Sequence, residues 1–144
     1  MAKDQSIAMD AEALERFLSA EFLQVAEEFS LEEVTADHLI VRLNVSDKHL
    51  RPGGTISGPS LFALADVGVY LAILSRIGPV ELAVTTNCSI DFMRKPAAGV
   101  DVLCHTRLLK LGRVLAVGDC LLFSDGVEAP VARATLTYSI PPNR

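Results

Sequence analysis

The chain has 144 residues, half of them hydrophobic, which is enough to bury the core of one domain. Its formal net charge of −5 argues against a nucleic-acid-binding surface. Its first twenty residues lack the basic start and apolar stretch of a secretory signal. Cys88, Cys104 and Cys120 have no metal-ligand spacing, and the three histidines are scattered. We therefore expect a cytoplasmic protein with reduced cysteines, no metal site and no nucleic-acid partner.

An amphipathic helix is predicted from a cap at Asp10 to about Glu27. Apolar residues recur along it at i, i+3 and i+4 spacing and form one stripe: Leu14, Phe17, Leu18, Phe22, Val25 and Ala26. Acidic residues keep the opposite face in water. We interpret residues 1–28 as an N-terminal helical extension that covers one edge or mouth of a domain spanning residues 29–144.

The pattern changes to a period of two after Phe29. Alternation along residues 39–45 predicts a strand, with a shorter strand before Ala36. A polar loop rich in glycine and proline follows, SDKHLRPGGTISG. Its glycines permit unusual backbone dihedrals and a close approach of backbone to a ligand. The loop is either a plain connector or part of a binding site, and its place directly before the next helix favours the site.

The helix predicted within residues 57–79 organises the rest of the chain. Ser57 can cap its start, Pro59 suits its first turn, and Gly78 and Pro79 end it. The intervening residues are apolar on every side, which is typical of a helix buried in a core or in a membrane. Asp66 lies in mid-helix and would cost roughly 2.5–3.5 kcal/mol at a bilayer centre. We therefore expect a helix enclosed by a sheet, and no membrane partner.

Four β-type stretches with short turns follow the helix. They are predicted at about residues 82–93, 100–110, 113–123 and 131–140, with a hairpin turn at Leu111-Gly112 and another turn at residues 124–126. In the first stretch, Val84, Thr86, Cys88, Ile90 and Phe92 are expected to share one face. Helix, strands, buried helix and four antiparallel strands predict an α+β roll in which a single sheet curls around the long helix.

Few polar groups lie where they could act beside this helix. The sequence has no Gly-x-Ser-x-Gly elbow, no visible Ser-His-Asp set and no phosphate-binding loop. What remains is Asp66, the free N–H groups around Gly58 and the strand residues Thr85, Thr86 and Asn87. A carboxylate in apolar surroundings can act as base or nucleophile, and helix N-terminal N–H groups can stabilise an oxyanion. This is the minimum for acyl transfer to water, although Asp66 could equally be a structural carboxylate.

A resemblance to a known family covers about residues 30–140 and is carried by RPGGTISGPSLFALADVGVYLAI, LAVTTNCSIDFMRKPAAG and LLKLGRVLAVGD. These segments resemble hotdog-fold acyl-CoA thioesterases of the PaaI-like (phenylacetate-degradation) branch, related to the 4-hydroxybenzoyl-CoA thioesterases. The resemblance implies a helix wrapped by an antiparallel sheet, with an acidic helix residue as base or nucleophile. That position falls on Asp66. It also implies a backbone N–H at the helix start as oxyanion donor, which falls on Gly58.

The chain departs from the family pattern at three positions. Ser57 and Pro59 stand where the family has the His and the second Gly of a His-Gly-Gly motif, and Arg51 stands where many relatives have Asn. A Ser or Thr on the strand after the helix often orients the water in relatives, and Thr85 is the nearest match. The resemblance thus implies Asp66, Gly58 and Thr85 as catalytic residues.

Coenzyme A carries phosphates, so basic residues should line the mouth of the site. Arg51, Arg94 and Lys95 are the preferred phosphate contacts. The full set of expected substrate-binding residues is Arg51, Ser57, Thr86, Asn87, Arg94 and Lys95. Coenzyme A is part of the substrate, so no cofactor is expected.

Three functions remain open. The first is a thioesterase that hydrolyses a small or medium acyl-CoA, aromatic acyl groups included. The second is a hotdog hydratase or dehydratase, which needs a His beside the acid, and none lies within ten residues of Asp66. The third is a non-catalytic acyl-CoA-binding protein, although sensors of that kind usually carry a DNA-binding domain. Nothing outside the roll is long or basic enough for one.

The spacing of two candidate groups predicts a dimer. Gly58 and Asp66 are eight positions apart on one helix, or about 12 Å at 1.5 Å per residue. An oxyanion donor must lie about 2.7–3.1 Å from the oxygen, and the attacking group about 3–3.5 Å from the adjacent carbon. One helix cannot place both, but two antiparallel copies can. We therefore expect a homodimer with two composite active sites, assembling further to a tetramer.

Overall fold

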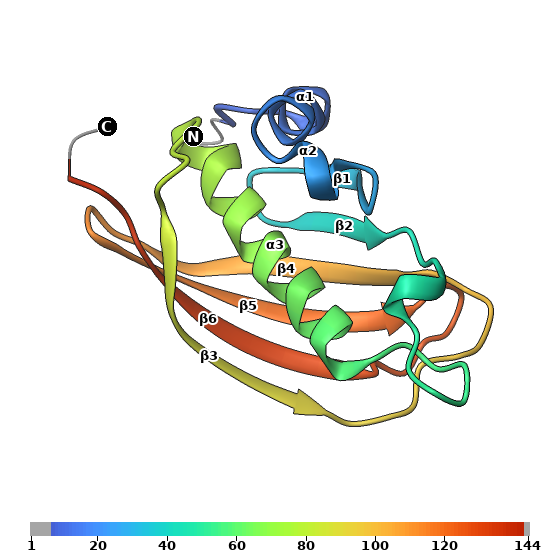
Figure 1. Cartoon of the computed structure of the whole chain (residues 1–144). Helices are drawn as coiled ribbons and strands as arrows, with labels where there is room; N and C mark the ends of the chain where they lie inside the picture. Colours follow the sequence, from blue (N-terminus) through green and yellow to red (C-terminus); the bar gives the residue numbers. More distant parts are fainter. Residues whose placement is uncertain (1–6, 143–144) are drawn as a thin grey trace.

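The structure is a computed structural model that describes residues 7–142. Residues 1–6 and 143–144, which belong to the predicted extension and main domain, lie outside the described residues. The elements in chain order are α1 (Ala11–Glu21), α2 (Leu23–Ala26), β1 (Phe29–Val34), β2 (Leu39–Leu43), a 3₁₀ helix (Asp47–His49), α3 (Gly58–Ile77), β3 (Val84–Phe92), β4 (Val102–Leu111), β5 (Leu115–Ser124) and β6 (Ala132–Ser139). The strands form one antiparallel sheet in the order β1-β2-β4-β5-β6-β3, curled around α3 (Figure 1). The predicted α+β roll is confirmed.

Helix α3 begins and ends where its capping residues predict. The Ser57 hydroxyl accepts the N–H of Ser60 at 3.2 Å, and Pro59 occupies the first turn. Gly78 follows the helix with φ of +93°, a conformation that favours glycine. By length and composition α3 could cross a membrane, but 61% of its most apolar stretch is buried inside the protein. The sheet supplies that cover, as expected of a core helix.

The N-terminal helix is not continuous, so the prediction of one helix to about Glu27 is wrong. It is interrupted at Phe22, whose backbone leaves the helical region with φ −134° and ψ 52°. The Phe22 ring packs edge-on against Tyr70 of α3, with ring centroids 5.7 Å apart. The stripe on α1 nevertheless joins the main core, since Leu14, Phe17 and Leu18 are buried.

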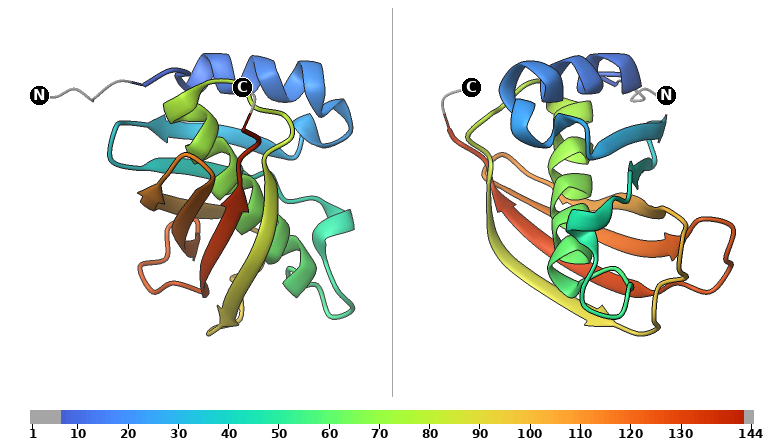
Figure 2. Two further views of the ribbon diagram at one scale, coloured as in Figure 1. Left: turned by 90° about the vertical axis from the view of Figure 1, so that its left-hand side faces the viewer. Right: turned by 45° about the vertical axis from the view of Figure 1, so that its right-hand side comes forward.

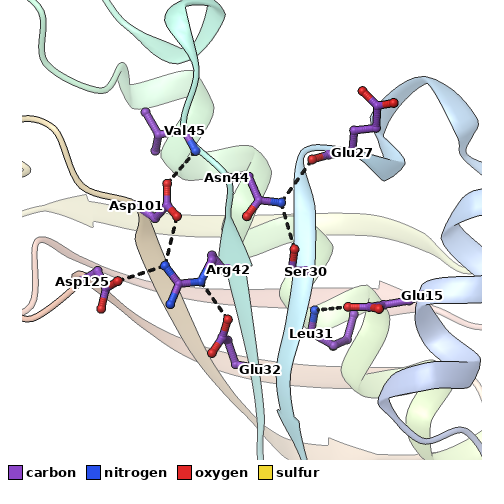
Figure 3. A network of polar contacts seen from close by, with 10 residues as sticks. All are labelled: Glu15, Glu27, Ser30, Leu31, Glu32, Arg42, Asn44, Val45, Asp101 and Asp125. Atoms are coloured by element: carbon purple, nitrogen blue, oxygen red, sulfur yellow. Dashed lines mark hydrogen bonds and ion pairs between the residues drawn. The ribbon is translucent and has the colours of Figure 1, made fainter.

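Helices α1 and α2 lie across the end of the roll where α3 terminates (Figures 1 and 2). The N–H of Ala8 donates to the Ser75 carbonyl of α3 at 2.7 Å. On the other side, the Glu15 carboxylate accepts the N–H of Leu31 in β1 at 2.9 Å (Figure 3). The N-terminal helices therefore cover one end of the domain, and hydrogen bonds to both α3 and the sheet hold them there.

Strand β3 contains a bulge that sequence alternation does not predict. Thr85 pairs with Tyr138 of β6, but the next pair joins Asn87 with Thr137, so Thr86 is an extra residue. After the bulge, Cys88 and Ile90 share the partly buried face with Thr85, whereas Val84 and Thr86 are exposed. The expectation that Val84 and Thr86 share the face of Cys88 is therefore wrong. The extra residue turns Thr85 inward.

A charged network fixes the ends of several strands on the outer side of the sheet (Figure 3). Arg42 of β2 donates to Glu32 of β1 at 2.7 Å, to Asp101 at 3.0 Å and to Asp125 at 2.9 Å. Asp101 also accepts the N–H of Val45 at 2.9 Å. The hydrogen bonds that Arg42 donates to Glu32, Asp125 and Asp101 raise its pKa, so it stays charged. The network joins the β1–β2 pair to the loops before β4 and after β5.

Candidate active site

Asp66 lies near the middle of α3, and its carboxylate is held by two hydroxyl groups from two strands. Thr85 of β3 donates to Asp66 Oδ1 at 2.6 Å, and the Tyr138 hydroxyl of β6 lies 2.7 Å from the same oxygen. The Tyr138 hydroxyl is also 3.0 Å from the Asp66 carbonyl. Within residues 7–142, no partner is recorded for Asp66 Oδ2. Asp66 Oδ1 is thus held in place, and Oδ2 can contact water or a substrate.

Both donors reach Asp66 because of the β3–β6 register. Thr85 and Tyr138 are paired across the strands, so their side chains emerge side by side toward α3. The bulge after Thr85 sets the face on which its hydroxyl lies. The sheet therefore delivers two donors to one carboxylate oxygen, which fixes the rotamer of Asp66.

Tyr138 is a site residue that sequence reasoning missed. In the sequence it follows Ala134 and Leu136 at alternate positions of the last predicted strand, so it reads as one more apolar residue facing inward. The available signal was its hydroxyl, because a buried tyrosine hydroxyl usually finds a hydrogen-bond partner. Tyr138 is 3% exposed, and burial together with the negative charge of Asp66 raises its pKa. It therefore stays protonated at neutral pH and acts as a donor.

A cavity of about 470 Å³ opens beside this carboxylate. Its walls come from both N-terminal helices and the break between them, from α3, from the α3–β3 connection and the start of β3, and from β6. They are formed by Leu18, Phe22, Val25, Asp66, Val67, Tyr70, Glu81, Ala83, Val84, Thr85 and Tyr138. This size lies within the range of small-molecule sites, and mostly apolar walls with a few convergent polar groups are typical of them.

The start of α3 places the Gly58 N–H at the end of β3 that lies away from Asp66. The Gly58 N–H, in the first turn, has no recorded acceptor among residues 7–142. A Cβ built on Gly58 would lie 3.5 Å from the ring of Phe92, the last residue of β3. Asp66, in contrast, is bonded to Thr85 near the first residue of β3. Within one copy, Gly58 and Asp66 therefore mark opposite ends of the same strand.

The structure brings only some of the predicted residues to the Asp66 carboxylate. Ser57 caps α3, and its hydroxyl also donates to the Ser60 hydroxyl at 2.9 Å. Thr86 is exposed and donates to the Thr137 carbonyl at 3.3 Å. Asn87 is exposed beyond the bulge. None of the three lines the cavity beside Asp66.

The three basic candidates are exposed and lie toward the Gly58 end. Arg51 belongs to the turn before α3, where its N–H donates to the Thr55 carbonyl at 2.8 Å. Arg94 follows β3 and donates to the Pro130 carbonyl at 2.8 Å. Lys95 is exposed beside it. Arg94 and Lys95 therefore lie beyond the end of β3 opposite to the Asp66–Thr85 contact of their own copy, and Arg51 lies in the loop that precedes Gly58.

The cysteines and histidines take no part in a metal centre in the described portion of the chain, where no cluster of three or more His, Cys, Asp or Glu could hold an ion. Cys104 and Cys120 are buried beside Thr106, at 3.3 and 3.5 Å from its hydroxyl. Burial and the nearby Asp66 charge raise the pKa of Cys88, which keeps it a thiol. Among residues 7–142, the side-chain partners of the Asp66 carboxylate are Thr85 and Tyr138, and neither is histidine.

Comparison with known proteins agrees with this architecture. The profile of the thioesterase superfamily matches residues 53–130. A candidate esterase of Pseudomonas aeruginosa is 32% identical over 125 residues, covering 87% of this chain and 92% of its own. The crystal structure of a candidate thioesterase from Silicibacter sp. is 57% identical, with a TM-score of 0.90 and coverage of 96% of both chains.

A third relative connects the chain with a named degradation protein. The phenylacetic acid degradation protein PaaI from Thermus thermophilus, solved as a point mutant, is 28% identical, with a TM-score of 0.68. The match covers 88% of this chain and 99% of that one. With the profile match and the sheet wrapped around α3, these relatives show that the chain belongs to the thioesterase superfamily, a family of thioester hydrolases with the hotdog fold.

Proposed function

We propose that the protein is an acyl-CoA thioesterase that hydrolyses an acyl group of small or medium size, aromatic groups included. The observation that carries the proposal is the Asp66 carboxylate, held through Oδ1 by Thr85 and Tyr138 at the wall of an apolar cavity. A structural carboxylate would be expected to have both oxygens satisfied. Here Oδ2 is free of recorded partners within residues 7–142 and can meet water or substrate.

The reaction follows from this arrangement. Asp66 takes a proton from water, whose oxygen attacks the thioester carbonyl carbon, and the carbonyl oxygen becomes an oxyanion. The Gly58 N–H stabilises that charge. The C–S bond then breaks, and the proton held by Asp66 passes to the departing thiolate, which gives free acid and coenzyme A. Direct attack by Asp66 through Oδ2 would give an acyl-aspartyl intermediate that water then hydrolyses.

Geometry favours a site shared between two copies. Strand β3 ends the sheet, and its outer edge has no partner strand in the described part of one chain. Apolar side chains are exposed along and beside this edge, with Val84 at 54% and Phe92 at 53%. An exposed apolar edge strand is prone to pair with another chain. We therefore propose that two copies pair through β3 about a twofold axis, with assembly to a tetramer left as a further expectation.

Antiparallel pairing of β3 would assemble the missing half of the site. Gly58 lies at the Phe92 end of β3, and Asp66 lies at the Thr85 end. In a twofold pair, the Phe92 end of one copy faces the Thr85 end of the other, so Gly58 of one copy approaches Asp66 of its partner. Arg94 and Lys95, which follow Phe92, would come to the same mouth and could meet the phosphates of coenzyme A.

A substrate panel tests the proposal. Thiol release from acyl-CoA esters ranging from acetyl to dodecanoyl, with benzoyl and phenylacetyl esters, should show turnover by the wild type. Asp66→Asn, nearly isosteric, should keep the fold and lower kcat roughly 10²–10⁴-fold. An acyl-CoA-binding protein would bind these esters without releasing thiol. A variant that keeps more than about a third of wild-type kcat would remove Asp66 from the mechanism.

A further inference from the structure

We propose that α1 and α2 form the end wall of the acyl pocket, and that Phe22, at the break between them, sets the size of the acyl group accepted. This inference rests on the proposed function and deepens it. The cavity beside Asp66 is lined from the N-terminal helices by Leu18, Phe22 and Val25. These residues precede the segment matched by the family profile, which begins at residue 53. The wall is therefore supplied by a part of the chain outside that segment.

Aromatic rings lead from the carboxylate to this wall. The Tyr138 hydroxyl is bonded to Asp66, and the Tyr138 ring lies 6.1 Å from that of Tyr70. The Tyr70 ring lies 5.7 Å from that of Phe22, at an interplanar angle of 90°. All three residues line the cavity. An acyl group whose carbonyl is held at Asp66 would extend along these rings and end against Phe22.

The wall is fixed rather than loosely attached. Leu18 is 3% exposed and belongs to the main core, and Phe17 packs behind Phe22 with ring centroids 6.0 Å apart. Bonds from Ala8 to Ser75 and from Glu15 to Leu31 tie α1 to α3 and to β1. A rigid wall can discriminate by size, because one additional methylene in a closed apolar pocket changes kcat/KM by roughly 10–200-fold.

The charges that line the cavity further restrict the class of acyl group that it can accept. Within residues 7–142, the charged residues that line the cavity are Asp66 and Glu81, both carboxylates. Burial together with Glu81 and Glu21 raises the pKa of Tyr70 to about 12, so its phenol stays neutral and adds no charge to the cavity. An acyl group with its own carboxylate would be repelled by these charges and would lose its hydration. The pocket therefore suits hydrocarbon or aromatic acyl groups and rejects dicarboxylic ones such as succinyl.

Three variants test the wall by changing its volume in both directions. Phe22→Leu shortens the wall, and Val25→Phe fills the cavity without removing any buried side chain. Phe17→Leu is the matched control, because it removes a ring from the same aromatic cluster without lining the cavity. We expect Phe22→Leu to raise the kcat/KM ratio of the longer to the shorter esters about tenfold, Val25→Phe to lower it about tenfold, and the control to leave it within about twofold.

The readout separates this inference from the proposed function. If the wild type releases thiol but Phe22→Leu and Val25→Phe keep its chain-length profile, or if Phe17→Leu shifts it equally, the wall is not formed by these residues. If the wild type releases no thiol, the proposed function fails. Calorimetric binding of the same esters to the wall variants and their control, each carrying Asp66→Asn, still measures the size profile. Succinyl-CoA turned over as well as butanoyl-CoA would contradict the charge argument.

Discussion

Removal of one hydroxyl group, by Tyr138→Phe, tests whether Asp66 must be held by the sheet. Tyr138 lies 2.7 Å from Asp66 Oδ1, and the substitution leaves its ring in contact with Tyr70 at 6.1 Å. A hydrogen bond to a charged group contributes about 1.5–3 kcal/mol. If that energy holds the carboxylate in its reactive orientation, its loss lowers kcat about 10-fold to 100-fold, at about 1.4 kcal/mol per factor of ten.

The fold should tolerate this change. Thr85 still donates to Asp66 Oδ1 at 2.6 Å, so no buried acceptor is left without a donor, and the free energy of unfolding should fall by no more than the about 1.5–3 kcal/mol of the lost bond. Steady-state thiol release gives kcat, and urea unfolding gives stability. Tyr70→Phe is the comparison, since its hydroxyl is bonded only weakly, at 3.4 Å to the Glu81 carbonyl, and kcat should fall much less. A Tyr138→Phe enzyme with kcat within threefold of wild type but reduced stability would refute a positioning role.

Two further predictions concern the roles of Ser57 and Thr85 and the ion pair between Glu28 and His49. Ser57→Ala should cost about 0.5–2 kcal/mol of stability and keep most activity, because Ser57 caps α3. Thr85→Val should lose activity with little loss of stability, because Thr85 donates to Asp66. The reverse result would mean that the structural and catalytic roles of the two residues are exchanged. Burial alone would raise the pKa of Glu28, but hydrogen bonds from His49 and Lys48 lower it from its ordinary value of 4.5. The charged form of Glu28 therefore stabilises the fold above about pH 4.5, and this contribution is lost as the pH falls through the lowered pKa. Urea unfolding of Glu28→Gln should show a deficit at neutral pH that shrinks in acid, and a deficit independent of pH would contradict this reasoning.

Local signals made much of the fold predictable. Ser57, Pro59 and Gly78 mark the ends of α3, and its apolar character on every side requires a surrounding sheet. Asp66 stands out because a carboxylate in such a helix needs a reason. These features depend on residues that are close together in the sequence, so they can be predicted from the sequence alone.

Features that depend on pairing were not predictable in the same way. The bulge at Thr86 exists only in the register between β3 and β6, and it determines which face Thr85 occupies. Tyr138 reads as one more inward-facing residue until that register places it beside Asp66. The break at Phe22 is likewise not visible in the sequence, where helical periodicity continues through it; in the structure the Phe22 ring packs against Tyr70.

Mixed dimers give the most direct test of the central claim that Asp66 of one copy works with Gly58 of the other. Gly58→Pro deletes the N–H, and the space beside Gly58 leaves an added Cβ in ordinary contact with Phe92 at 3.5 Å. Each parent dimer, Asp66→Asn or Gly58→Pro, should be inactive. A heterodimer of the two should contain one intact site and recover about half of wild-type activity per dimer. Folded heterodimers that remain inactive would contradict the shared site.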